Sequence, residues 1–297
     1  MENKKINILI LGANGQLGRF ITRHALANSK LNVNILVRDP EKSKDLVDQV
    51  EKQGGKVFIG DITSPESIKD VTKGIHTVIS ALGAFDEKTM IEGQTNVLKD
   101  AVKNGVKRFF PAEFALNYDK ATKEENPMVN LKLTFQEILN KTPIKSVRVS
   151  HGVFTETYFA FQAQGFGYWG DINQKLDITT YEDTAKYTVA LAADEEKHGR
   201  FVFVGEQLST KEIAEIYNRV RGTNIKPKRH GSLEDLNNLI EKLKREGDFI
   251  EYTFSGLRRL MHDGRGKYHT FNNKDYPEIK ITTLEEFLKA NPDYQLK

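Results

Sequence analysis

The sequence has no cysteine among its 297 residues. This absence excludes disulfide bonds, a catalytic thiolate and cysteine-ligated zinc. Long apolar runs are missing too, because no stretch approaches the roughly 18 apolar residues that a membrane helix needs. The apolar run near the N-terminus, INILIL, is also too short for the core of a signal peptide. We therefore expect a cytoplasmic protein with no membrane partner.

An excess of charge of one sign is also lacking, since 44 basic and 41 acidic residues leave a net charge of +3. Lysine and glutamate alternate along the predicted helices, whereas a nucleic-acid binder gathers basic residues on one face. We expect no nucleic-acid partner. The sequence contains neither a G-x-S-x-G elbow nor an H-E-x-x-H helix. No pair of the seven histidines has metal-ligand spacing on a helix, so no metal site is predicted.

What is present is an alternation of short apolar runs with helical patterns. Ile6–Leu11 is almost wholly apolar, which is typical of a strand covered on both faces, and Leu17–Ala27 carries a helical stripe. Further strands are predicted at Val33–Val37, Lys56–Ile59, Thr77–Ala81, Arg108–Pro111 and Ile144–Val149, and helices at Pro40–Gln53, Met90–Lys103 and Met128–Asn140. This order predicts an α/β fold with a Rossmann-type, doubly wound parallel sheet.

The alternation becomes irregular after the sixth predicted strand. Residues 154–173 are rich in aromatics and glycine and are predicted to form loops rather than sheet. We place a dinucleotide-binding domain at residues 1–152. Residues 153–297 are expected to form a smaller C-terminal lobe, partly interleaved with the sheet, that completes a substrate pocket.

The strongest local pattern is GANGQLG, which lies between the first predicted strand and the first helix. The first glycine permits a sharp exit from the strand, the second lets the backbone approach a pyrophosphate, and the third allows close packing of the helix. The helix N-terminus then offers N–H groups to phosphates. A plain strand-to-helix turn is the alternative. The cofactor-binding residues predicted here are Gly12, Asn14, Gly15, Gln16, Leu17 and Gly18.

The second predicted strand ends in LVRDP, which bears on the choice of dinucleotide. An acidic residue at this tip favours the ribose hydroxyls of NAD, whereas an arginine accommodates the phosphate of NADP. Arg38 occupies the tip and Lys42 follows one turn later, so we predict NADP(H). Asp39 keeps NAD open as an alternative, and both basic residues are otherwise ordinary surface charges.

Two other strand ends are expected to face the cofactor, because ligands bind beyond the carboxyl ends of parallel strands. Asp61 and Ile62 close the third strand, where the Asp61 carboxylate can accept a hydrogen bond from the adenine amino group. Ala81, Leu82 and Gly83 close the fourth, where small residues let the backbone run beside a dinucleotide. Ordinary turn chemistry explains either sequence equally well.

Several motifs together resemble one known family. GANGQLG, VRD, VISALG, RFFPAEF, VRVSHGVF, GDINQKLDITTYEDTAKYT and PEIKITTLEEFL occur in the order found in NmrA-like and isoflavone-reductase-like proteins, an atypical branch of the short-chain dehydrogenases. The resemblance spans nearly the whole chain. It implies an NADPH-dependent reductase.

The same resemblance points to Lys132, because the plant reductases carry a catalytic lysine 17 residues before the end of the sixth strand. Lys132 would act as the proton donor or acceptor, or would instead hold the nicotinamide ribose or a substrate oxygen. The chain departs from the plant pattern at Gln136, where an arginine is usual, and at Gly152, where an asparagine is usual. Both departures weaken an assignment to isoflavonoid substrates.

The aromatic residues Phe114, Phe154 and Tyr158 are predicted to line a substrate pocket for a flat, conjugated or carbonyl compound, although such residues are often simply core. The resemblance also implies a second hypothesis, a redox-sensing regulator, because NmrA-like proteins include members that bind NADP(H) without turnover and control a protein partner. The presence of Lys132 favours the enzyme. A monomer or homodimer is expected in either case.

Overall fold

The computed structural model describes residues 5–160 and 165–296. Its internal contacts divide the chain into two compact units. The first unit comprises Met1–Phe114, Leu131–Val149 and Thr184–Phe201, and the second comprises Ala115–Asn130, Ser150–Asp183 and Val202–Lys297. The chain therefore passes between the units several times, once between Val149 and Ser150. The division into two domains near residue 152 stays a prediction.

The first unit is built on a seven-stranded sheet with the order β10-β6-β5-β4-β1-β2-β3. The strands are β1 (Ile6–Leu11), β2 (Leu31–Val37), β3 (Val57–Ile59), β4 (Thr77–Ser80), β5 (Arg108–Phe110), β6 (Lys145–Ser150) and β10 (Gly199–Val202). Neighbouring strands from β3 through β6 pair in parallel. The order 3-2-1-4-5-6 is that of a Rossmann sheet, so the predicted fold class is confirmed.

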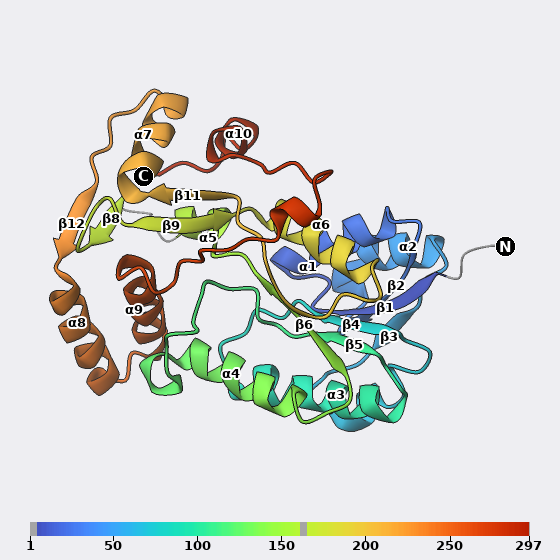
Figure 1. The fold of residues 1–297 in the computed structure, drawn as a ribbon. Coiled ribbons are helices and arrows are strands. Elements are labelled where there is room, and N and C mark those ends of the chain that lie inside the picture. Colours follow the sequence, from blue (N-terminus) through green and yellow to red (C-terminus); the bar gives the residue numbers. More distant parts are fainter. Residues whose placement is uncertain (1–4, 161–164, 297) are drawn as a thin grey trace. The chain divides into compact units, whose positions relative to one another are not determined.

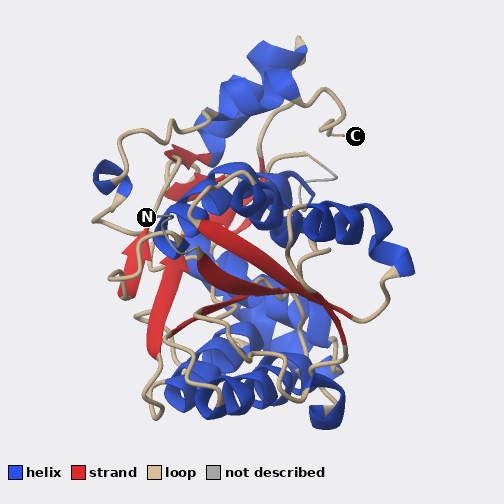
Figure 2. Cartoon of the chain, turned by 90° about the vertical axis from the view of Figure 1, so that its right-hand side faces the viewer, coloured by secondary structure: helices blue, strands red, loops and turns tan. Residues whose placement is uncertain are grey.

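Helices lie on both faces of this sheet (Figures 1 and 2). They are α1 (Gln16–Leu26), α2 (Lys44–Lys52), α3 (Gln94–Lys103), α4 (Pro127–Leu139) and α6 (Tyr181–Ala192). Figure 1 shows α1 and α2 on one face and α3 and α4 on the other. Such two-sided cover is what the apolar strands require, and Ile8, Leu9 and Ile10 in β1 are fully buried.

Two of the predicted helices begin differently from the prediction. The helix expected from Pro40 starts with a 3₁₀ turn at Glu41–Ser43 before α2. The helix expected from Met90 starts earlier, with a π-helix at Lys88–Gly93 that runs directly into α3. Three further short 3₁₀ turns lie at Pro65–Ile68, Lys123–Glu125 and Asn273–Asp275.

A buried arginine holds the end of α6 within the first unit. Arg108, at the start of β5, is only 1% exposed. Its guanidinium donates to the carbonyl oxygens of Leu191, Ala192, Asp194 and Lys197 at 2.6–3.2 Å. The last carbonyls of a helix have no partner within the helix, and a cation is favoured at that end. Arg108 therefore supplies the C-terminal cap of α6.

The second unit, taken by itself, contains two small sheets and the remaining helices. One sheet has the order β11-β9-β7 and the other pairs β12 with β8. The strands are β7 (Val153–Phe154), β8 (Gly167–Trp169), β9 (Lys175–Thr179), β11 (Glu206–Ser209) and β12 (Lys228–Gly231). The helices are α5 (Thr155–Ala160), α7 (Thr210–Arg221), α8 (Leu233–Glu246), α9 (Phe249–His262) and α10 (Leu284–Ala290).

The prediction of loops over residues 154–173 was wrong for much of its length. Helix α5 and strand β8 form there, while residues 161–164 lie outside the described part of the chain. The aromatic residues of this stretch build a core: Phe159 stacks on Tyr217 at 5.9 Å, and Phe166 meets the same ring edge-on. Their high density reflects packing within the second unit.

Gly152 explains one of the departures from the plant pattern. It adopts a φ of 85°, and a Cβ placed on it would lie 2.3 Å from the carbonyl oxygen of Asp177. Only glycine accepts both this left-handed backbone and this close approach. An asparagine cannot be accommodated here without moving β9.

Glu156 makes the stability of the second unit depend on pH. Burial raises the pKa of its carboxyl group to about 7, partly opposed by the backbone hydrogen bond from Tyr181 at the start of α6. In the unfolded chain the Glu156 carboxyl group has its ordinary, lower pKa and binds the proton less tightly. The stabilisation that Glu156 contributes is therefore fully present below that lower pKa and is lost as pH rises through 7.

We expect the unfolding free energy of Glu156→Gln to increase relative to that of the wild type by up to about 3 kcal/mol as pH rises from 5 to 8. Urea unfolding at both pH values measures this, and an unchanged difference would contradict it.

Candidate cofactor site

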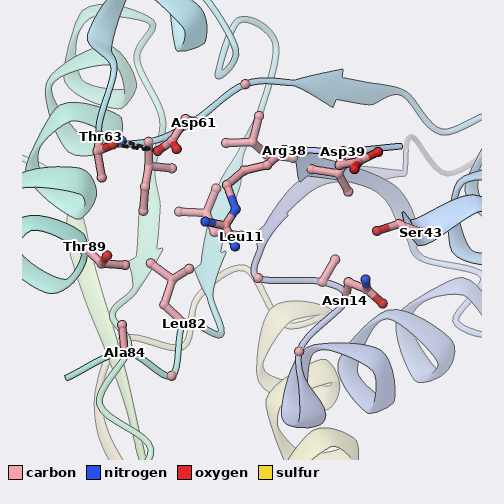
Figure 3. Close-up of a pocket in the computed structure, with 18 of the residues that line it drawn as sticks. Leu11, Asn14, Arg38, Asp39, Ser43, Asp61, Thr63, Leu82, Ala84 and Thr89 are labelled. Carbon is pink, nitrogen blue, oxygen red and sulfur yellow. Dashed lines mark hydrogen bonds between the residues drawn. The ribbon is translucent and has the colours of Figure 1, made fainter. Parts of the chain in front are cut away.

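A cavity of about 980 Å³ opens at the carboxyl ends of β1, β2, β3 and β4. Strand β1 lies between β2 and β4, so the cavity is at the point where the strand order reverses, as ligand sites of open α/β sheets usually are. Figure 3 shows its lining residues converging from these strand ends. Every lining residue belongs to the first unit.

The glycine loop forms one wall, and its glycines are required by close contacts. Gly12 has a φ of 72°, and a Cβ on it would lie 2.8 Å from the Ala81 carbonyl oxygen. A Cβ on Gly18 would lie 2.0 Å from the Gly12 carbonyl oxygen, so α1 starts directly against the turn. The Gly15 N–H closes the turn by donating to that same oxygen at 2.8 Å. The turn is therefore as tight as a dinucleotide-binding loop needs to be.

Asn14 connects the glycine loop by hydrogen bonds to α1 and to the turn before α2. Its Oδ1 accepts hydrogen bonds from the Arg19 guanidinium at 2.7 and 3.0 Å, and its Nδ2 donates to the Lys42 carbonyl at 3.4 Å. Among the described residues, no side chain caps the N-terminus of α1, and its first turn carries no acidic residue. The positive end of the helix is thus left for an anionic ligand.

The two charged residues at the tip of β2 have different environments. The guanidinium of Arg38 points into the cavity (Figure 3). Asp39 instead accepts hydrogen bonds from the backbone N–H groups of Glu41 and Lys42 at 3.1 and 3.4 Å and pairs with the Lys42 ammonium at 3.4 Å. These hydrogen bonds lower the pKa of Asp39 although desolvation opposes them. Both residues line the cavity, but the guanidinium of Arg38 points into the ligand space while the carboxylate of Asp39 caps the following turn.

Asp61, at the end of β3, is held by its neighbour Thr63. Oδ1 of Asp61 accepts hydrogen bonds from the Thr63 N–H and hydroxyl, each at 2.8 Å (Figure 3). These bonds, with a smaller contribution from the Arg38 charge, lower the pKa of Asp61. A contact with an adenine amino group would therefore fall to Oδ2.

The structure brings together most of the predicted cofactor residues. Those lining the cavity are Gly12, Asn14, Gly15, Arg38, Lys42, Asp61, Ile62, Leu82 and Gly83. Gln16, Leu17, Gly18, Ala81 and Lys132 are not among the lining residues. Residues that line it but were not predicted include Ser43, Thr63, Ala84, Asp86, Lys88 and Thr89. Thr63 lies two residues after the predicted Asp61 and could have been inferred from that strand end. The loop residues beyond Gly83 carry no recognised motif.

Lys132 lies on α4 and reaches the turn that follows β5. Its Nζ donates to the carbonyl oxygens of Ala112 at 2.9 Å and Glu113 at 2.7 Å. Desolvation lowers the pKa of Lys132 to about 8, and the buried Glu113 opposes this shift. Strand β5 is next to β4 in the sheet, and β4 runs into the cavity wall at Leu82. An ammonium group with its pKa lowered to about 8 therefore lies one strand away from the cavity.

The predicted substrate-binding residues are divided between the units. Phe114 belongs to the first unit and is half-buried. Phe154 lies between the tilted rings of His151 and Tyr181 in the second unit, with ring centroids 3.9 and 4.1 Å away. Tyr158 is only 4% exposed and lies in the aromatic core of that unit, and His151 is 1% exposed. For Tyr158 this burial favours the core alternative over a pocket wall.

Within residues 5–160 and 165–296, no three side chains of the metal-ligating kinds come together to hold a metal ion. In the same residues, no helix is both long and apolar enough to cross a membrane.

The strand order and the glycine turn define a Rossmann-type protein. The family model of the NmrA-like family matches residues 4–288, so the chain belongs to that family. It is 27% identical to an isoflavone reductase of Pisum sativum, over 97% of this chain and 98% of that protein. A solved isoflavone reductase superposes with a TM-score of 0.81 at 22% identity, covering 97% of this chain and 99% of that one. The triphenylmethane reductase of Citrobacter sp., solved in complex with NADP(H), gives a TM-score of 0.73 at 20% identity, with coverages of 96% and 99%.

Proposed function

We propose that the cavity binds NADP(H), with the pyrophosphate on the glycine loop and the additional phosphate on Arg38 and Lys42. The observation that carries this proposal is the division of roles at the tip of β2, where Arg38 points into the cavity and Asp39 caps a turn. The tight glycine turn and the uncapped start of α1 fit the pyrophosphate. The NADP(H) complex of the related triphenylmethane reductase supports the same choice.

We further propose that the protein is a reductase acting on a small conjugated, aromatic or carbonyl compound. When bound, NADPH would supply a hydride. The chain's own part is to hold the cofactor and to deliver a proton, which we assign to the Lys132 ammonium. Its lowered pKa suits a general acid near neutral pH, because the proton is available and yet readily given up. The isoflavone reductase among the relatives supports this reaction class.

The cofactor assignment predicts the effect of removing the Arg38 guanidinium. We expect Arg38→Ala to weaken NADPH binding by roughly 10- to 100-fold, because a hydrogen-bonded charge pair contributes about 1.5–3 kcal/mol. NADH, which lacks the extra phosphate, should bind the variant as it binds the wild type. Calorimetric titration of both cofactors measures this. Lys52→Ala, an exposed change on α2 outside the cavity, is the matched control.

Turnover distinguishes the reductase from a redox-sensing regulator, the alternative that fits the same cofactor site. NADPH consumption should be followed at saturating cofactor with a panel of quinones, enones and aromatic aldehydes. Reduction of at least one compound class supports the enzyme. Tight NADPH binding with no turnover across the panel, together with a protein partner whose binding depends on the redox state of the cofactor, supports the regulator.

A further inference from the structure

Gln94, the first residue of α3, is a buried polar side chain with both ends of its amide engaged. It is 1% exposed. Its Nε2 donates to the Met90 carbonyl oxygen at 2.5 Å, and its Oε1 accepts from the Ala112 N–H at 3.1 Å. If the amide were rotated by 180°, its NH₂ group would face the Ala112 N–H and its oxygen would face the Met90 carbonyl oxygen. Neither pair can form a hydrogen bond, so the orientation of the amide is fixed.

The Ala112 contact links Gln94 to Lys132. The Lys132 ammonium donates to the carbonyl oxygens of Ala112 and Glu113, in the same turn whose N–H group is held by Gln94. That turn is tight, since the Glu113 N–H donates back to the Pro111 carbonyl at 2.7 Å. A shift of the Ala112 peptide would therefore move the oxygens on which the ammonium rests.

The Met90 contact links the same side chain to the cavity. Met90 lies in the π-helix Lys88–Gly93, whose first residues Lys88 and Thr89 line the cavity. The backbone N–H of Gln94 donates to Ile91 instead of to Met90, and the side chain supplies a donor to the Met90 carbonyl. Single turns of π-helix frequently occur at functional sites. Gln94 thus joins the cavity wall to the turn that holds Lys132.

We propose that Gln94 is a positioning residue that holds the Lys132 ammonium in place for proton transfer through the Ala112–Glu113 turn. This inference rests on the proposed role of Lys132. It assigns to Gln94 no contact with substrate or cofactor. Its effect is on where the ammonium lies and how it is solvated.

The first test needs neither cofactor nor turnover. The rate of reductive methylation of Lys132 is measured against pH in the free protein by peptide mass spectrometry, which reports the titration of this one amine. Gln94→Met keeps the volume of the side chain and removes both hydrogen bonds. We expect the pKa of Lys132 to be lower in this variant than in the wild type by at least half a unit, because the carbonyl acceptors of the ammonium are no longer well placed.

Thr95→Val is the matched control. Thr95 is the next residue on α3, and within the described chain its buried hydroxyl has no hydrogen-bond partner. This variant disturbs the same helix without removing a hydrogen bond, so the pKa of Lys132 should equal that of the wild type. An unchanged or raised pKa of Lys132 in Gln94→Met overturns the proposal, since it would mean that Gln94 only supports packing or keeps water out.

Kinetics provide the second test. Gln94→Met should lower kcat by roughly 10- to 100-fold, as small misplacements of a catalytic group do, and leave the NADPH dissociation constant unchanged. Thr95→Val, which removes no hydrogen bond, should retain the wild-type kcat. Equal losses in both variants would contradict the proposal. If wild-type protein shows no turnover, the reductase assignment fails, while the methylation test still decides the role of Gln94.

Discussion

Lys132→Met is expected to reduce kcat by roughly 10²- to 10⁴-fold, the usual contribution of a positioned general acid. Methionine matches the length of the apolar stem but has no proton to give. The NADPH dissociation constant should stay within about twofold of the wild-type value, because Lys132 is not among the residues lining the cofactor cavity. Stopped-flow measurement of NADPH oxidation, paired with calorimetry of cofactor binding, separates the two quantities.

The pH dependence of kcat provides an independent check on the same group. The pKa of Lys132 is lowered to about 8 by desolvation, so the ammonium predominates below pH 8 and the neutral amine above it. If the ammonium donates the proton, reductive turnover should be high below pH 8 and fall as pH rises through it. Lys141→Met, a change at an exposed lysine just beyond α4, should leave the profile unaltered. A flat profile between pH 7 and 9.5 would argue against Lys132 as the donor.

Arg108→Met is expected to be strongly destabilising, at about 3–5 kcal/mol of unfolding free energy. The methionine fills part of the space of the arginine but leaves four carbonyl oxygens without their shared donor: those of the last two residues of α6 and those of Asp194 and Lys197 just after it. Such a loss follows from the cost of burying polar groups without partners. Urea unfolding of the purified variant measures it.

Two comparison variants separate the cap from simple packing. Arg108→Lys keeps the charge, but a single ammonium cannot reach all the acceptors that a planar guanidinium reaches, so an intermediate loss is expected. Lys107→Met, at the exposed neighbouring position, should change the unfolding free energy by less than about 0.5 kcal/mol. A loss below 1 kcal/mol in Arg108→Met would show that the carbonyls find other partners.

The fold of the first unit could be predicted because its signals are local. A buried parallel strand such as Ile6–Leu11 must be apolar on both faces, and this requirement is visible without any knowledge of its neighbours. The turn after it needs glycines at fixed spacing, and Arg38 stands at the strand tip where a phosphate is met. The predicted cofactor residues along β1 and β2 depended only on these short-range rules.

The aromatic stretch of the second unit shows where such rules stop. Residues such as Tyr158 and Phe166 carry no sequence mark that tells a pocket wall from a core, since both are apolar. Their burial comes from contact with Tyr217 and with α10, more than 50 residues further along the chain. Gly152 is similar, because the reason for its glycine is the Asp177 backbone on another strand.

The sequence by itself determined the Rossmann sheet, the glycine turn and the basic tip of β2, because strand burial and turn chemistry act over a few residues. Only the tertiary structure decided the surroundings of Lys132. Its acceptors lie 19 and 20 residues earlier, and Gln94 holds them from 18 residues further back. The pKa of an amine depends on desolvation and on nearby charges and dipoles. These are set by which segments fold against it, and no local pattern records that.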